Sequence, residues 1–203
     1  MASETSFVAT DPVFGLVLAG GESRRMGRDK ALLVRNGRSQ LDYVATLLEA
    51  VTNRVFVSTR QEQKNDAERS RFDQIVDRYD GIGPVAGILS AMDAYPEADW
   101  LVVACDLPNI DQPTLEYLLE HRSAQQPFTA FRSSYDNLPE PLCALYRSGS
   151  DAIVRQFVDD GIVCPRKILL RSDTCLLVQP NPAALDNINT PDDLAASVLE
   201  AAS

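Results

Sequence analysis

The segment Leu101–Cys105 reads LVVAC and contains no polar residue. A strand with one face open to water alternates apolar and polar side chains, whereas an uninterrupted apolar run is typical of a strand that is buried on both faces. Strands of that kind belong to parallel sheets that helices cover on both sides. The segment therefore predicts the central strand of an α/β domain.

Candidate strands and helices alternate around this segment. Short β-prone runs predict strands at 14–18, 54–59, 74–77, 128–131, 142–146 and 174–178. Apolar residues at helical spacing predict helices at 41–51, 85–94, 112–122 and 151–158. Residues 61–71 are polar without a clear period, so we expect a loop or a frayed helix there, and Thr190–Asp193 (TPDD) predicts the start of a C-terminal helix. The alternation predicts an open three-layer α/β sheet with right-handed crossovers.

The composition is that of one globular domain. The chain has 203 residues, of which 45% are apolar and 24% charged, and we assign residues 13–203 to a single domain. Residues 1–12 lack the basic and apolar regions of a signal peptide, so we expect a mobile tail and a cytoplasmic protein without a membrane span. A net charge of -10 argues against a nucleic-acid partner, which requires a basic face.

The cysteines predict no special chemistry. Cys105, Cys143, Cys164 and Cys175 form no C-x-x-C pair, and no secretory signal accompanies them. We expect four reduced thiols, mostly buried.

A glycine-rich, cationic segment follows the first predicted strand. Residues 16–30 read LVLAGGESRRMGRDK. Backbone N–H groups at Gly20 and Gly21 could approach an anion closely, and the cationic side chains that follow would add positive charge. A plain glycine turn followed by a solvated basic helix explains the same residues. The rest of the chain must decide between these readings.

Three polar features are expected at one edge of the sheet, because ligands of such sheets bind beyond the carboxyl ends of the strands. The glycines follow the first strand, Asp77 ends the third, and Asp106 follows the apolar run. Asp106 could bind Mg²⁺ beside a phosphate or merely cap the following loop. With Lys30 and Arg25 as phosphate-binding cations, the set favours nucleotidyl or phosphoryl transfer.

Other catalytic classes find little support in the residues. The single histidine, His121, lies in a predicted amphipathic helix and is expected at the surface or at a helix end. The chain has no G-x-S-x-G, H-E-x-x-H or Walker A pattern, and the first loop lacks the G-x-G-x-x-G spacing of a dinucleotide site.

Several motifs together resemble the signature of molybdenum cofactor guanylyltransferases, a branch of the nucleotidyltransferases with a Rossmann-like fold. They occur in the same order along the chain: LAGG at 18–21, Ser23, RMG at 25–27, DKAL at 29–32, VD at 76–77, GPVAGI at 83–88, CDLP at 105–108, EPL at 140–142 and NINTP at 187–191. The resemblance implies a three-layer fold with a mostly parallel central sheet.

The resemblance also implies roles for individual residues. Backbone groups of the first loop would bind GTP, Lys30 would contact its phosphates with Arg25 nearby, and Asp106 would bind both nucleotide and Mg²⁺. Further nucleotide contacts and the pterin-side residues are implied as follows: Leu18, Ala19, Gly20, Gly21, Asp77 and Gly83 for the nucleotide, and Glu140, Pro141, Asn187 and Asn189 for the pterin. One departure concerns the asparagine that the family often has after its second strand. Thr59 stands there and is expected to act as a shorter hydrogen-bonding group.

The implied reaction is the transfer of GMP from GTP to the terminal phosphate of molybdopterin, with apo-molybdoenzymes or their chaperones as transient partners. Cytidylyl transfer to molybdopterin, or nucleotidyl transfer to a sugar or polyol phosphate, is a rival, although Gly21 and the Asp29–Lys30 pair resemble the guanylyl branch. A catalytically silent nucleotide-binding regulator is another. The presence of both Lys30 and Asp106 argues against it.

Overall fold

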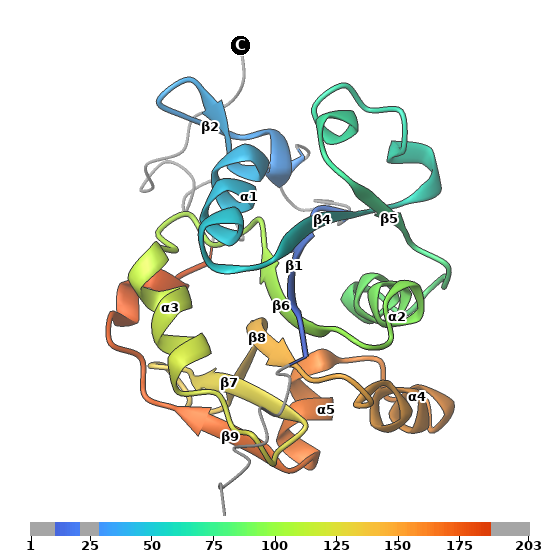
Figure 1. Cartoon of the computed structure of the whole chain (residues 1–203), viewed down its shortest axis with the longest axis vertical. Coiled ribbons are helices and arrows are strands. Elements are labelled where there is room, and N and C mark those ends of the chain that lie inside the picture. Colours follow the sequence, from blue (N-terminus) through green and yellow to red (C-terminus); the bar gives the residue numbers. More distant parts are fainter. Residues whose placement is uncertain (1–10, 21–28, 188–203) are drawn as a thin grey trace, which may run out of the picture.

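The computed structural model of the protein describes residues 11–20 and 29–187. Within these residues, seven strands form one twisted sheet in the order β5-β4-β1-β6-β8-β7-β9 (Figure 1). Their bounds are β1 Val13–Leu18, β4 Arg54–Thr59, β5 Gln74–Val76, β6 Asp99–Ala104, β7 Phe128–Arg132, β8 Pro139–Tyr146 and β9 Thr174–Leu177. β1, β4, β5 and β6 run parallel, and β8 runs antiparallel to its neighbours β6 and β7. β9 is parallel to β7. The predicted mostly parallel α/β sheet is confirmed.

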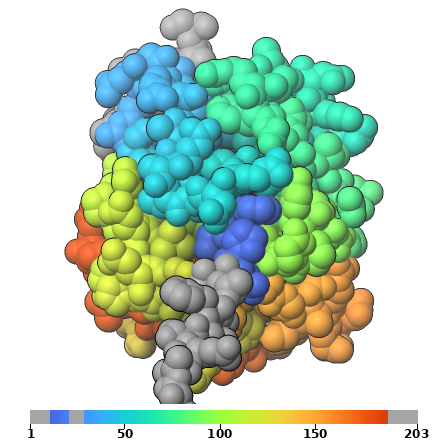
Figure 2. Space-filling view, viewed as in Figure 1, coloured from blue at the N-terminus to red at the C-terminus, as the bar shows by residue number. Residues whose placement is uncertain are grey.

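Helices cover both faces of this sheet. α1 (Gln40–Val51) and α3 (Gln112–Glu120) lie on one side, and α2 (Pro84–Ala94), α4 (Asp151–Asp159) and α5 (Pro165–Arg171) on the other (Figure 1). Every residue of β6 is buried, as its unbroken apolar run predicts. In the space-filling view, the dark blue start of the described chain lies in the middle of the visible face (Figure 2).

The parallel strands bring distant parts of the chain to one edge. Leu18, the last residue of β1, pairs in register with Ser58 of β4 and with Ala104 of β6. The residues that follow these three strands therefore emerge side by side. Thr59 pairs with Val76 in the same way, which places Asp77 at the same edge.

Several elements differ from the sequence prediction. A two-stranded hairpin, β2 (Val34–Arg35) with β3 (Arg38–Ser39), turns through Asn36 and Gly37, both at positive φ. This Asn-Gly turn is a strong hairpin signal that the sequence prediction missed. α5 was missed as well, and β8 begins three residues before the predicted strand. Residues 61–71 contain two short 3-10 turns, η2 (Gln61–Gln63) and η3 (Arg69–Arg71).

The first described residues and the cysteines add detail to the sequence prediction. Pro12 O accepts a hydrogen bond from Asp99 N, and Ser148 Oγ donates one to Asp11, so both residues are hydrogen-bonded to the domain. All four cysteines are reduced, as expected. Only Cys105 and Cys143 are buried, however, while the other two are exposed or half-buried. Among the described residues, none of the helices is both long and apolar enough to cross a membrane.

Candidate active site

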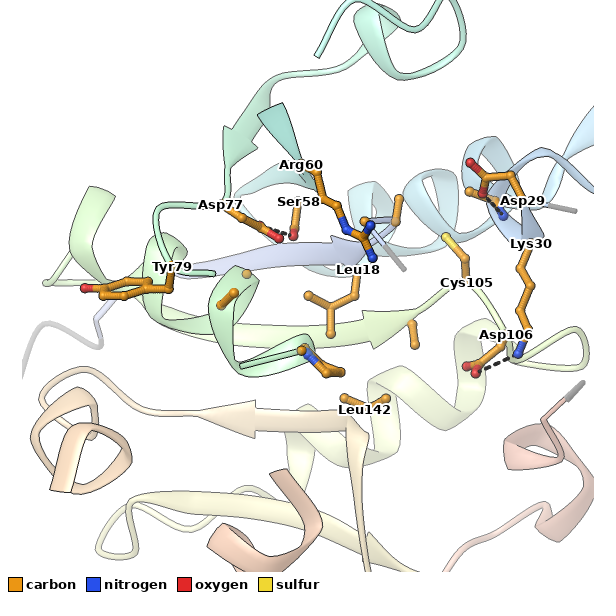
Figure 3. A pocket seen from close by; sticks show the side chains of 18 of the residues that line it. Leu18, Asp29, Lys30, Ser58, Arg60, Asp77, Tyr79, Cys105, Asp106 and Leu142 are labelled. Carbon is orange, nitrogen blue, oxygen red and sulfur yellow. Dashed lines mark hydrogen bonds and ion pairs between the residues drawn. The ribbon is translucent and has the colours of Figure 1, made fainter. Parts of the chain in front are cut away.

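A cavity of about 770 Å³ opens at the carboxyl ends of β1, β4, β5 and β6. This is the usual location and size of a small-molecule site in such a sheet. Figure 3 shows polar side chains at two ends of the cavity, with Leu18 and Arg60 between them. One end holds Asp29, Lys30 and Asp106, and the other holds Ser58, Asp77 and Tyr79.

The first end is built on an ion pair between Lys30 and Asp106. Lys30 Nζ lies 3.4 Å from Asp106 Oδ2, and the two side chains are 18% and 23% exposed. Asp106 follows β6, and Lys30 begins the 3-10 turn η1 (Lys30–Leu32). Asp29 caps that turn, because its Oδ1 accepts a hydrogen bond of 3.0 Å from Ala31 N. The pair therefore joins residues 76 positions apart at the rim of the cavity.

The loop after Asp106 is tied to the segment after Lys30. Three side chains of residues 35–43 each donate a hydrogen bond to a carbonyl of this loop: Arg35 to Pro108 O at 3.0 Å, Gln40 to Leu107 O at 2.9 Å and Tyr43 to Ile110 O at 2.8 Å. The bond from Gln40 is fully buried. Satisfied buried hydrogen bonds fix a single geometry. These three bonds therefore help to hold Asp106 at its distance from Lys30.

The second end is built on Asp77. Its Oδ1 accepts a hydrogen bond of 2.8 Å from Ser58 Oγ. Burial raises the pKa of the Asp77 carboxyl above its ordinary value, and the hydrogen bond from Ser58 opposes that shift. A half-buried carboxylate with one oxygen occupied leaves the other oxygen to accept N–H donors of a ligand.

Two glycines of the α2 region shape this end of the cavity. Gly83 caps α2 with φ of +58°, a conformation that favours glycine. Pro84 then starts the helix. Gly87 lies so close to β4 that a Cβ there would stand 2.3 Å from Ser58 Oγ. The helix can approach the strand, and Ser58 can reach Asp77, only because residue 87 has no side chain.

The described lining residues carry more acid than base. They include the carboxylates of Asp29, Glu62, Asp77, Asp80 and Asp106 against the cations Lys30 and Arg60. Arg60 extends from the end of β4 toward Leu18 (Figure 3). A polyphosphate would therefore need further cations in this cavity, either from arginines at 24–28 or from a metal ion that arrives with it.

The donor set at Asp106 suits a magnesium ion shared with a substrate. Among the described residues, no group of three or more His, Cys, Asp and Glu side chains could hold a metal ion alone. Mg²⁺ is commonly held by one or two carboxylates together with substrate phosphates rather than by an all-protein cage. The Asp106 carboxylate, open to the cavity, provides that kind of ligand.

Cys105 lines the cavity beside Asp106, but its thiol is not activated to act as a nucleophile. It is buried, and burial, aided by the Asp106 charge, raises the pKa of its thiol far above the ordinary value. The thiol therefore stays neutral at physiological pH, whereas the thiolate is the reactive form.

The chain carries the sequence pattern of a known domain. Residues 15–174 match the MobA-like NTP transferase domain. The chain belongs to the MobA-like NTP transferase family. The matched region begins within β1 and extends past β8, so it includes the carboxyl ends of all four strands that form the cavity.

Individual relatives agree with this membership. The molybdenum cofactor biosynthesis bifunctional protein of Synechocystis sp. is 36% identical over 187 residues, which cover 92% of this chain and 54% of that protein. The chain thus spans about half the length of that relative. The molybdenum cofactor guanylyltransferase of Ectopseudomonas mendocina is 31% identical, with 95% of each chain covered. The crystal structure of molybdopterin-guanine dinucleotide biosynthesis protein A from Archaeoglobus fulgidus has a TM-score of 0.75 at 26% identity, covering 90% of this chain and 95% of that one.

The structure of this MobA-like chain brings most of the expected nucleotide residues together. The cavity is lined by Leu18, Ala19, Gly20, Lys30, Asp77, Gly83 and Asp106. Thr59 does not line it, and the expectation for this residue is corrected. Its side chain is fully buried on the opposite face of β4 and lies 3.2 Å from Gln74. Ser58, the preceding residue, takes the place at the cavity because adjacent side chains of a strand point to opposite faces.

Three of the expected pterin-side residues are described, and Glu140, Pro141 and Asn187 do not line the cavity. Leu142 lines the cavity, and Glu140, two residues earlier in β8, accepts a hydrogen bond of 2.9 Å from Arg166 of α5. Pro141 precedes Leu142, and Asn187 is exposed after the last described turn. Gly21, Arg25 and Asn189 lie outside the described residues.

The sequence prediction missed Ser58 and Arg60, which line the cavity, and the buried Arg69. Ser58 and Arg60 flank Thr59, and the alternation of the strand places Ser58, not Thr59, toward the cavity. The fully buried Arg69 lies in residues 61–71, where a loop or a frayed, solvated helix was expected. Nothing in its local sequence distinguishes it from the exposed Arg71.

Proposed function

We propose that this protein transfers GMP from GTP to the terminal phosphate of molybdopterin, producing molybdopterin guanine dinucleotide and pyrophosphate. The observation that carries the proposal is the two-ended cavity. A cation and a carboxylate 3.4 Å apart stand at one end, and a carboxylate held by Ser58 stands at the other. The membership in the MobA-like family and the names of its relatives support the same assignment.

The triphosphate would lie at the Lys30 end. Lys30 would donate hydrogen bonds to phosphate oxygens, and backbone N–H groups at Gly20 and Gly21, together with Arg25, would complete the anion site. Asp106 would hold Mg²⁺ against the phosphates. The ion, when bound, neutralises charge on the α-phosphate and the leaving pyrophosphate.

The base and the sugar would lie at the Asp77 end. Guanine presents two adjacent N–H donors on its Watson–Crick edge, and a carboxylate accepts such a pair. Asp77 has one oxygen engaged by Ser58, so its second oxygen and the backbone near Gly83 are the groups we assign to the nucleoside.

The acceptor would enter from the β8 side. Leu142 forms that wall of the cavity, and Glu140, Pro141, Asn187 and Asn189 are the residues that we assign to the pterin. An oxygen of the acceptor's terminal phosphate would form a bond to the α-phosphorus of GTP as the bond from that phosphorus to the pyrophosphate oxygen breaks. No covalent intermediate on the protein is needed, in keeping with the neutral thiol of Cys105. Transient contact with apo-molybdoenzymes or their chaperones, and a cytoplasmic location, complete the proposal.

The test supplies purified protein with Mg²⁺, one of the four NTPs in turn, and either molybdopterin or a sugar or polyol phosphate as acceptor. It measures nucleotide binding, pyrophosphate and the nucleotidylated product. We expect product from GTP at least tenfold faster than from CTP, ATP or UTP. Product from CTP and not from GTP would reject the base assignment, and product only with a sugar or polyol phosphate would reject the acceptor. Nucleotide binding without any product would favour a silent regulator.

A further inference from the structure

Arg69 is a buried cation in a polar segment. It lies in η3, between β4 and β5, and its side chain is 1% exposed. Arginine is seldom buried, because removing its charge from water is costly unless carboxylates and carbonyls replace the solvent. The partners of this side chain therefore indicate why it is there.

The Arg69 guanidinium joins the two residues that flank residues 20–28, Ala19 and Asp29. Its Nη2 donates a hydrogen bond of 2.7 Å to Ala19 O and another of 2.6 Å to Asp29 Oδ2. Ala19 directly precedes residues 20–28 and Asp29 directly follows them. A third partner, Asp66, lies 3.3 Å from Nη1 and anchors the guanidinium to its own segment.

Asp29 connects Arg69 to the end of the cavity that holds Lys30 and Asp106. Asp29 uses one oxygen for Arg69 and the other to cap the turn that begins with Lys30. Lys30 in turn pairs with Asp106. Arg69 itself does not line the cavity, so any influence on the reaction must pass through Ala19 and Asp29.

We propose that Arg69 is a positioning residue of the nucleotide site. It fixes the distance between the two ends of residues 20–28 and sets the orientation of Asp29, and thereby of Lys30 relative to Asp106. This inference rests on the proposed function, since it assigns Arg69 to the support of a triphosphate site. A planar guanidinium is needed because one nitrogen serves two acceptors in fixed directions while another faces Asp66. A lysine ammonium would provide charge without that geometry.

The same turn offers a matched control. Arg71, two residues further on, is also paired with two carboxylates, Glu68 at 2.7 Å and Asp42 at 3.3 Å. Its side chain is 55% exposed and touches neither end of the glycine-rich segment. A general effect of losing an ion-paired arginine from η3 would appear at both positions.

The experiment compares Arg69→Lys with Arg71→Lys by thermal unfolding, nucleotide titration and steady-state kinetics, using whichever NTP the wild type turns over. We expect Arg69→Lys to lose at least tenfold in kcat/KM, with kcat reduced because Lys30 is misplaced, while the folded protein keeps its cooperative transition. Arg71→Lys should stay within twofold of the wild type. A folded Arg69→Lys with wild-type kcat and KM would overturn the inference.

A second variant guards against a failure of Arg69→Lys to fold. Asp29→Asn leaves Arg69 with Ala19 and Asp66 but weakens the link toward Lys30, and we expect the same tenfold loss. In the double variant the two losses in kcat/KM should be far from additive, because both break one connection. Full additivity, or an Asp29→Asn protein with wild-type kinetics, would overturn the inference. A wild type that binds no NTP would instead reject the proposed function and this inference together.

Discussion

Ser58 Oγ and Asp77 Oδ1 lie 2.8 Å apart, joined by a hydrogen bond across neighbouring strands β4 and β5. α2 packs against the Ser58 side chain, and Gly87 of this helix leaves room for the serine hydroxyl. The other carboxylate oxygen, Oδ2, faces Gly20, since a Cβ built on that glycine would lie 3.4 Å from it. Asp77 therefore lies between the part of the cavity assigned to the nucleoside and Gly20, the first glycine after β1.

The first prediction is that Asp77→Asn stabilises the fold while it weakens GTP binding. Burial raises the pKa of Asp77, so the folded protein bears a cost for its ionised form at neutral pH. Asparagine keeps an oxygen for the hydrogen bond from Ser58 and removes that charge. Thermal unfolding at pH 7 should show a higher Tm, and calorimetry should show at least tenfold weaker GTP binding.

The pH dependence follows from the direction of the shift. A carboxyl whose folded-state pKa is raised makes its most favourable contribution below the unfolded pKa, near its ordinary value of 3.8. That contribution is lost as pH rises through the folded-state pKa. The difference in Tm between Asp77→Asn and the wild type should therefore shrink as pH is lowered from 7 toward 4. A wild type more stable than the variant at neutral pH would contradict the prediction.

The second prediction is that Gly20 serves nucleotide binding, whereas Gly87 serves the packing of the fold. Gly20→Ala should fold normally, because its Cβ would make ordinary contacts of 3.4 Å with Asp77 Oδ2 and 3.6 Å with Arg60. The added methyl group would occupy the space where a nucleotide meets the backbone, so GTP affinity should fall about tenfold or more.

Gly87→Ala is the contrasting variant. Its Cβ would stand 2.3 Å from Ser58 Oγ and 2.9 Å from Leu18 Cδ2. We expect a loss of about 1–3 kcal/mol in the free energy of unfolding, as for an overpacked core. Urea unfolding of the two variants side by side checks the distinction. Unchanged GTP affinity in Gly20→Ala would mean that this glycine serves only the turn.

The third prediction concerns Asp106. Asp106→Asn should lower turnover by about two orders of magnitude. The neutral amide is a poor ligand for Mg²⁺ and does not neutralise the charge of the Lys30 ammonium. Asp73→Asn is the control, since Asp73 is an exposed carboxylate that pairs with Arg54 away from the cavity. Initial rates are measured across a Mg²⁺ titration. Near-normal turnover in a folded Asp106→Asn protein would remove this carboxylate from the mechanism.

The strands and the rim of the site could be predicted because they follow from local patterns. An apolar run such as Leu101–Cys105 can satisfy its burial only in the middle of a covered sheet, and parallel strands then bring Gly20, Asp77 and Asp106 to one edge. Which residue of a strand end faces the cavity depends on the register, and a shift of one position exchanged Ser58 for Thr59.

Other features depend on contacts between distant residues. Arg69 is buried because Ala19 and Asp29 meet it from 50 and 40 residues away, and the polar sequence around it carries no sign of this. α5 is only seven residues long, too short for a clear helical period.

The fourth prediction tests whether Lys30 is a specific contact or part of a diffuse positive field. Lys30→Ala removes a charge that lies 3.4 Å from Asp106 at the cavity rim, and transition-state stabilisation should fall by about 3 kcal/mol, mainly through kcat.

The control is Arg38→Ala, because Arg38 is 55% exposed, follows the β2–β3 turn and pairs with Asp42 of α1. An exposed pair of this kind contributes under about 1 kcal/mol. The sequence alone suggests Arg28 as a control, but that residue lies outside the described ranges. Both variants are assayed at low and at physiological ionic strength, since a diffuse field would weaken with salt for both alike. Equal losses for Lys30→Ala and Arg38→Ala would mean that the cavity gathers phosphate by general charge, and Lys30 would lose its assigned role.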